Sequence, residues 1–163
     1  MAYLRGILLC FSLFAQTLQA ADNIGDTQLA VWVNEAIVAT YTYNYQNYIK
    51  QQKDIAAYFT AKGWIAYSNA LIASKLPEAV EKNKYYVNAV ATMPPEIKIL
   101  HDNYWQAIMP LLVIYKNPQY QQKQSVEITI EFTTTTNGLG VRGLAITSLQ
   151  SKIIKPPCQC STD

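Results

Sequence analysis

The stretch Val126-Glu127-Ile128-Thr129-Ile130-Glu131-Phe132-Thr133 alternates apolar and polar residues over its whole length. Successive side chains of a β-strand point to opposite faces of a sheet, so this alternation predicts a strand with one buried face and one wetted face. Asn137-Gly138 follows shortly afterwards and is typical of a tight hairpin turn. The second half of the chain is therefore expected to form an antiparallel sheet.

Similar segments of period two lie on both sides of this stretch. Met93-Pro94-Pro95 and Asn117-Pro118 interrupt them. Pro110 stands inside an apolar run and predicts a bulge, an edge or a bend, because proline has no N–H to donate to a neighbouring strand. The expected strands are residues 85–92, 96–104, 105–116, 121–135 and 139–154.

The first half of the chain has helical spacing instead. Thr27 is a good N-cap residue, and the apolar stripe of an amphipathic helix follows it. That stripe consists of Leu29, Trp32, Val33, Ala36, Ile37 and Thr40.

Shorter helices are expected after this one. Residues 41–48 fit both a strand and a helix, so we expect an irregular link near Asn44. A second helix is expected within residues 48–59, Thr60 caps a third, and Pro77 can open one or two further turns. About three helices on one face of a curved, mostly antiparallel sheet make an α+β cone or half-barrel. The third helix is expected to carry Trp64, Ile65, Tyr67, Ser68, Leu71 and Ile72.

The N-terminus has the three parts of a secretory leader. Arg5 precedes an apolar run over residues 6–15, and small residues follow at Ala20 and Ala21. The run is about half the length that a spanning helix needs, although an uncleaved short anchor remains an alternative. We expect a leader over residues 1–20, one domain over residues 21–155, and a periplasmic protein, with inner-membrane association as the alternative.

Charge and cysteine usage narrow the function. Without the leader, 12 basic residues balance 11 acidic ones, and they form no basic stripe, so a nucleic-acid partner is not expected. Cys158 and Cys160 lie in a tail over residues 156–163, where they could pair with each other, bridge to another chain or remain unimportant thiols. A metal site at these two cysteines is the least favoured of these possibilities, since two ligands are too few. No cofactor is expected.

One distinctive run resembles a known family. It comprises Trp32, Tyr41-Thr42-Tyr43-Asn44-Tyr45, Tyr58-Phe59-Thr60 and Gly63-Trp64. The chain is similar here to the DotI/IcmL family of type IVB (Dot/Icm) secretion-system proteins, which is related to the TraM conjugation proteins. The resemblance implies a nuclear-transport-factor-2-like fold shared with the VirB-eight assembly factors. It is strongest over residues 32–71 and looser near Arg142.

The resemblance also implies partners. Core members of the family begin with a cytoplasmic segment and one transmembrane helix, whereas this chain begins with a leader, so it looks like a soluble relative of the periplasmic domain. Its partners would be inner-membrane or periplasmic subunits of the secretion system, with self-association as a further option.

Two readings of the chemistry stay open. The fold also hosts enzymes, and His101 with Asp102, helped by Tyr43, Tyr67 or Tyr104, could form a lyase-like or ligand-binding site in the cone. A lone His beside an Asp is more often a surface pair. A secreted effector or adhesin is a third class that a leader alone does not exclude.

The tyrosines favour a non-enzymatic interaction domain. The chain has 12 tyrosines and 4 phenylalanines, a bias toward rings with a polar tip that suits half-buried and interface positions. Most are expected to line the cone. Four rings in residues 41–48 exceed what one buried stripe holds, so some should lie at a contact surface. The candidate interface residues are Tyr41, Tyr43, Tyr45, Tyr48 and Trp105.

Overall fold

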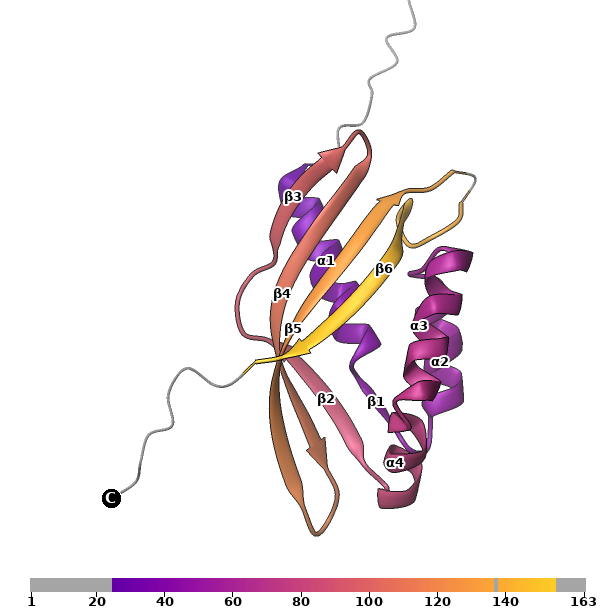
Figure 1. Cartoon of the computed structure of the whole chain (residues 1–163), viewed down its shortest axis with the longest axis vertical. Coiled ribbons are helices and arrows are strands. Elements are labelled where there is room, and N and C mark those ends of the chain that lie inside the picture. Colours follow the sequence, from indigo (N-terminus) through magenta and orange to yellow (C-terminus); the bar gives the residue numbers. More distant parts are fainter. Residues whose placement is uncertain (1–24, 137, 155–163) are drawn as a thin grey trace, which may run out of the picture.

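A computed structural model describes residues 25–136 and 138–154. Four helices and a two-residue strand come before five longer strands, and the six strands form one antiparallel sheet (Figure 1). About three helices followed by strands were predicted, and the fourth helix begins beside Pro77, where one or two further turns were expected. The leader, Asn137 and the pair Cys158 and Cys160 lie outside the described residues. The elements are α1 (Asp26–Thr40), β1 (Tyr43–Asn44), α2 (Tyr48–Ala56), α3 (Ala61–Ala73), α4 (Leu76–Asn83), β2 (Tyr86–Ala91), β3 (Glu96–His101), β4 (Tyr104–Lys116), β5 (Gln121–Thr134) and β6 (Leu144–Ile153).

The long strand β4 organises the sheet, whose order is β1-β2-β4-β5-β6 with β3 beside the first half of β4. On that same edge, β2 pairs with residues 111–116 and β3 with residues 104–108. Pro110 lies in the gap between the two partners, where no N–H is needed, and its carbonyl accepts from the Thr92 amide at 3.0 Å. Of the bulge, edge or bend predicted at this proline, the structure shows a local edge.

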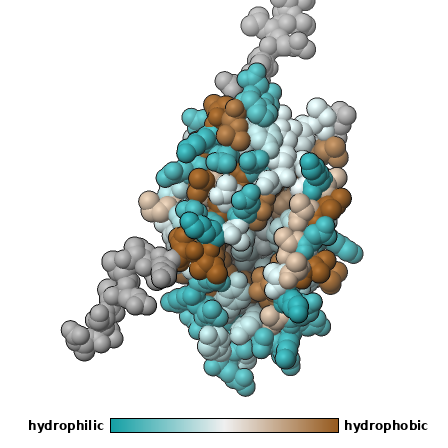
Figure 2. All heavy atoms as spheres, in the orientation of Figure 1, coloured by the Kyte–Doolittle hydropathy of each residue, from teal (hydrophilic) through white to brown (hydrophobic). Residues whose placement is uncertain are grey.

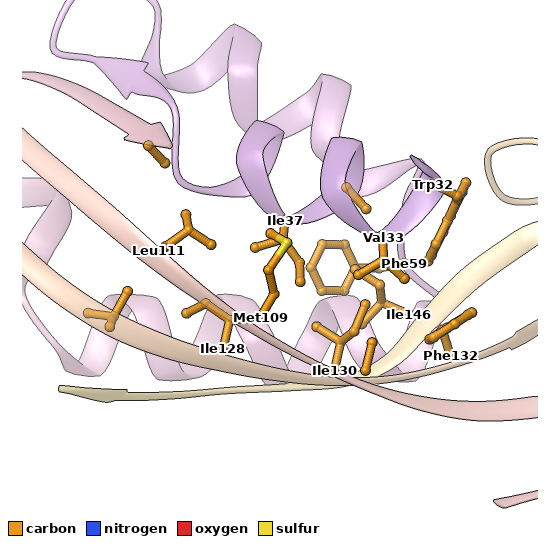
Figure 3. Close-up of a cluster of buried hydrophobic side chains, with 14 of the residues drawn as sticks. Trp32, Val33, Ile37, Phe59, Met109, Leu111, Ile128, Ile130, Phe132 and Ile146 are labelled. Carbon is orange, nitrogen blue, oxygen red and sulfur yellow. The ribbon is translucent and has the colours of Figure 1, made fainter. Parts of the chain in front are cut away.

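Helix α1 lies across the concave face of the sheet. Its six buried residues are the six of the predicted stripe. Figure 3 shows Val33 and Ile37 of α1 pointing toward Met109, Ile128 and Ile130 of the strands. The helix begins at Asp26 rather than after Thr27, because extended Gly25 takes the cap position. The core is thus a helix stripe packed on the inner faces of β4 and β5.

The link between α1 and α2 is irregular, as expected. It contains the two-residue strand β1, whose Tyr43 pairs with Val87. Asn44 Oδ1 then accepts from the Gln46 amide at 2.8 Å and the Asn47 amide at 3.1 Å. Such a side-chain turn stops the strand and starts the next helix.

Helix α3 is attached to the edge strand β6. Thr60 caps the helix by accepting from the Gly63 amide, as predicted. The Thr60 amide donates to the Ile146 carbonyl at 2.9 Å, and the Ile146 amide donates to the Tyr58 carbonyl at 2.7 Å. These bonds hold the start of α3 against β6.

The residues predicted for α3 lie on both the exposed and the buried side of the helix. Ile65 and Ile72 are 60% and 65% exposed, whereas Trp64 and Tyr67 pack against the core. The attachment at β6 turns Gly63 toward the strand. Residues one and two turns after Gly63, such as Tyr67, therefore face the sheet, and the two isoleucines face outward. The helix buries a narrower stripe than its composition suggested.

Candidate functional site

The structure separates the five candidate interface residues. Trp105 is buried on the concave face and stacks on Phe132 with ring centroids 5.4 Å apart. Tyr43 is also buried, while Tyr41, Tyr45 and Tyr48 are half-buried and pack against the core. Trp105 and Tyr43 are core side chains, and only part of the tyrosine run reaches the surface.

An aromatic patch lies at the end of the molecule formed by β1, α2 and β2. The ring edge of Tyr45 meets Tyr86 at 5.6 Å, and Tyr86 is 42% exposed. Ile49 lies on the first turn of α2, lines the same cleft as Tyr45 and Tyr48, and is 70% exposed. We define the aromatic patch as Tyr45, Tyr48, Ile49 and Tyr86.

A cleft of about 300 Å³ separates this patch from α4. Pro77, Glu78 and Glu81 of α4 form its far wall. Burial, and then the Glu78 carboxylate, raise the pKa of the Tyr48 hydroxyl above its usual value. The patch therefore has an apolar floor beside two acidic side chains.

Sequence reasoning missed half of this patch. Ile49 was read only as support for a helix, and Tyr86 only as part of a strand. A signal for Ile49 was available, because the other apolar residues of α2, such as Ile55, lie on the buried side of the helix. Figure 2 shows apolar side chains at the surface on the side of the helices α2–α4, mixed with polar ones.

A second cavity lies between α3 and the part of the sheet that is formed by the end of β4, the beginning of β5 and the end of β6. This cavity has a volume of about 770 Å³. Four tyrosines converge on it: Tyr41 after α1, Tyr43 on β1, Tyr67 on α3 and Tyr115 on β4. Among the described residues that line the cavity, none is Asp, Glu, Lys, Arg or His.

Burial of these hydroxyls raises their pKa values. Desolvation is the main cause for all four, and it raises the pKa of Tyr41 to about 12. For Tyr43, the neighbouring tyrosines raise the pKa further, because a phenolate there would repel theirs. The hydroxyls are therefore neutral at any physiological pH and can act as hydrogen-bond donors.

The His101–Asp102 pair lies outside the tyrosine-lined cavity. Both residues are exposed at the turn between β3 and β4, and the His101 ring stacks on Tyr104 at 4.5 Å. The Tyr104 hydroxyl donates to Glu131 at 2.8 Å and lies 2.9 Å from the Thr147 hydroxyl. The alternative that placed His101 or an acid inside a cone cavity is contradicted, since neither His101 nor Asp102 lines the cavity.

Residues 25–136 and 138–154 contain no group of three His, Cys, Asp or Glu side chains placed to hold a metal ion. In the same ranges, no helix has the length and apolar character required to cross a membrane.

The arrangement of helices and strands defines the class of protein. The chain has a nuclear-transport-factor-2-like α+β fold, of the kind found in secretion-system assembly proteins. CagV, a VirB8 homolog of the type IV secretion system of Helicobacter pylori, has a TM-score of 0.64 at 8% identity over 78% of this chain and 98% of that chain. At this identity the likeness concerns the fold alone.

Relatives with higher sequence identity identify the family within this fold class. An IcmL-like type IV secretion-system protein from Legionella pneumophila is 62% identical with a TM-score of 0.80, over 83% of this chain and 98% of that one. The periplasmic domain of DotI is 30% identical with a TM-score of 0.73, over 78% and 95%. A comparison with curated proteins gave no match.

The family model for DotI/IcmL, described as a type-IV b secretion system inner-membrane complex component, matches residues 15–152. The chain belongs to the DotI/IcmL family.

Proposed function

We propose that this protein is a non-enzymatic docking subunit of a type IVB secretion system that acts in the periplasm. Family membership supports the association with the secretion system. The single observation that carries the docking role is the aromatic patch with Glu78 and Glu81 beside it. Its partners would be inner-membrane or periplasmic subunits, and self-association is the second form of the same proposal.

The periplasmic location rests on the leader over residues 1–20 and on the likeness to the DotI periplasmic domain. We expect cleavage after Ala20, which would release the domain from the membrane. N-terminal sequencing of protein from a periplasmic extract should then begin at Ala21 or Asp22. A product that begins at Met1 in the membrane fraction would contradict the release.

The physical case for docking starts from the rings. Tyrosine brings a large apolar area with few rotatable bonds, so little conformational entropy is lost when a partner covers it. Tyr45 and Tyr86 already hold each other edge to face. Exposed Ile49 adds an aliphatic anchor that water solvates poorly. Together they form the kind of cluster that dominates interface energies.

The acidic side chains add a chemical preference. Glu78 and Glu81 line the cleft, and none of the described residues that line it is Lys or Arg. A partner with a Lys or Arg at the rim of its own surface would be steered toward this side of the patch. The proposed partner surface is therefore apolar with a basic edge.

Ile49→Asp tests the patch. We expect affinity for the partner subunit to fall about tenfold or more, because a carboxylate would be buried beside Glu78 and Glu81 without a counter-charge. Ile72→Asp is the matched control, since Ile72 is 65% exposed on α3 and lies outside the patch. That variant should bind within about twofold of the unchanged protein.

The measurement is co-purification from cells that express the type IVB inner-membrane and periplasmic subunits, followed by titration of the retained subunit. Sedimentation of the purified protein alone would measure self-association. If neither a subunit nor a second copy is retained, the docking role is wrong. If Ile49→Asp and Ile72→Asp bind equally well, docking uses another surface.

The enzymatic alternative gains no support from the geometry. A lyase of this fold needs a general base in the cone, and the described lining of the cavity has tyrosines, glutamines and serines but no carboxylate or imidazole. Binding without chemistry is the part of that alternative which the cavity favours.

A further inference from the structure

The tyrosine-lined cavity lies apart from the aromatic patch. It is bounded by α3, the end of α1 and the inner face of the sheet and is partly open to solvent, whereas the patch faces outward between α2 and α4. Its volume of about 770 Å³ is within the range of small-molecule sites. Its lining is also typical of such sites, with aliphatic walls and a few convergent polar groups.

The walls and the polar groups come from different elements. Val113 and Val126 of the sheet and Leu71 of α3 provide aliphatic surface. The polar side is formed by tyrosine hydroxyls, with Gln124 and Gln150 near the strand ends. A bound molecule would therefore contact hydrocarbon over most of its surface and find hydrogen-bonding groups in a small part of it.

Two of the four tyrosine hydroxyls do not donate a hydrogen bond to any described residue. Within the described part of the chain, neither the Tyr43 nor the Tyr115 hydroxyl takes part in a hydrogen bond, although Tyr43 is only 5% exposed. Neither oxygen is fully buried, so each reaches the space of the cavity, where water or a ligand acceptor can satisfy it. The neutral state of these hydroxyls keeps the proton available for donation.

We propose that this cavity binds an uncharged, mainly apolar small molecule that carries an oxygen acceptor such as a ketone carbonyl. The absence of charged side chains from the described lining disfavours an ion, because its lost hydration would not be replaced. The tyrosine donors favour a carbonyl oxygen over a pure hydrocarbon, which would leave them unsatisfied. The inference goes beyond the docking role and does not depend on it.

The probe for this site is 6-propionyl-2-dimethylaminonaphthalene, an uncharged aromatic ketone whose emission shifts to the blue in apolar surroundings. The full chain should bind it saturably, with a blue shift. The anionic probe 1-anilinonaphthalene-8-sulfonate should bind at least about tenfold more weakly, because its sulfonate would lack a counter-charge. Equal affinity for both probes would overturn the inference.

Ala70→Trp tests whether binding occurs in the cavity. Ala70 lines the cavity, and a tryptophan there would fill part of it, so ketone affinity should fall about tenfold or more. Ala66→Trp is the matched control, since Ala66 is also exposed on α3, one turn earlier, and does not line the cavity. That variant should bind within about twofold of the unchanged protein.

Tyr43→Phe tests the hydrogen bond and retains the ring. It should weaken ketone binding by roughly two- to tenfold, the range expected for one neutral hydrogen bond. Binding of 2-ethylnaphthalene, measured by its displacement of the ketone, should change less than twofold, because this molecule has no acceptor. If the ketone does not bind saturably, or if Ala70→Trp and Tyr43→Phe both leave its affinity unchanged, the site is not as proposed.

Discussion

Trp32→Ala is expected to destabilise the domain by about 4 kcal/mol, because it removes a large, fully buried aromatic side chain. Trp32 is only 1% exposed and is the largest fully buried side chain. Its ring lies 5.1 Å from that of Phe132 and 6.1 Å from that of Tyr58, so it joins α1 to β5 and to the loop before α3. Removing it would leave a large void among groups that cannot collapse together.

The indole of Trp32 also anchors the loop before β6 through a hydrogen bond. Its Nε1–H donates to the Val141 carbonyl at 2.8 Å, and Arg142 next to it pairs with Glu35 of α1. The ion pair is half-exposed and adds little stability by itself. The segment before β6 is therefore attached to α1 chiefly through Trp32.

Urea unfolding followed by circular dichroism measures this effect. Trp32→Phe is the control, because it retains an aromatic ring and removes the hydrogen bond. It should cost clearly less than Trp32→Ala, by about 2 kcal/mol. A loss below about 1 kcal/mol for Trp32→Ala would show that Trp32 does not have the central packing role described.

Gly63→Ala is the second large effect, with an expected loss of about 2 kcal/mol. An ideal Cβ at Gly63 would lie 2.5 Å from the Ile146 carbonyl oxygen and 3.1 Å from that of Thr147. Both are backbone atoms of β6, which cannot move without disturbing its pairing with β5. Alanine gains about 1 kcal/mol of helix propensity over glycine, but the clash should outweigh it.

Thermal unfolding of Gly63→Ala should show a midpoint several degrees below that of the unchanged protein. Gly25→Ala is the control, since nothing lies within 4 Å of a Cβ built there. That change should cost at most about 1 kcal/mol through the helix cap. If Gly63→Ala is as stable as the unchanged protein, α3 does not approach β6 as closely as described.

The tyrosine run over residues 41–48 serves both candidate sites. Tyr41 and Tyr43 line the cavity, whereas Tyr45 and Tyr48 belong to the aromatic patch. The side-chain turn at Asn44 divides the two pairs, and Tyr43 still meets Tyr48 edge to face at 5.7 Å. The excess of rings that suggested one contact surface is divided between an outer and an inner site.

Much of the fold could be predicted from local patterns. The α1 stripe and the alternation of β5 were read correctly, because burial of one face imposes a period on the sequence. Pro110 marked a local edge for a covalent reason, the missing N–H. The orientation of α3 could not be predicted in this way, since its apolar residues Ile65 and Ile72 stayed outside when the helix was attached at Gly63.

The sequence by itself determined the order of helices and strands, the inner face of α1 and the membership of a family through the run from Trp32 to Trp64. Only the tertiary structure decided which tyrosines meet. Tyr41, Tyr67 and Tyr115 lie on three separate segments, and periodicity shows which side of a segment is buried without showing what covers it. Long-range packing brought those hydroxyls to one cavity and left Ile49 and Tyr86 at the surface.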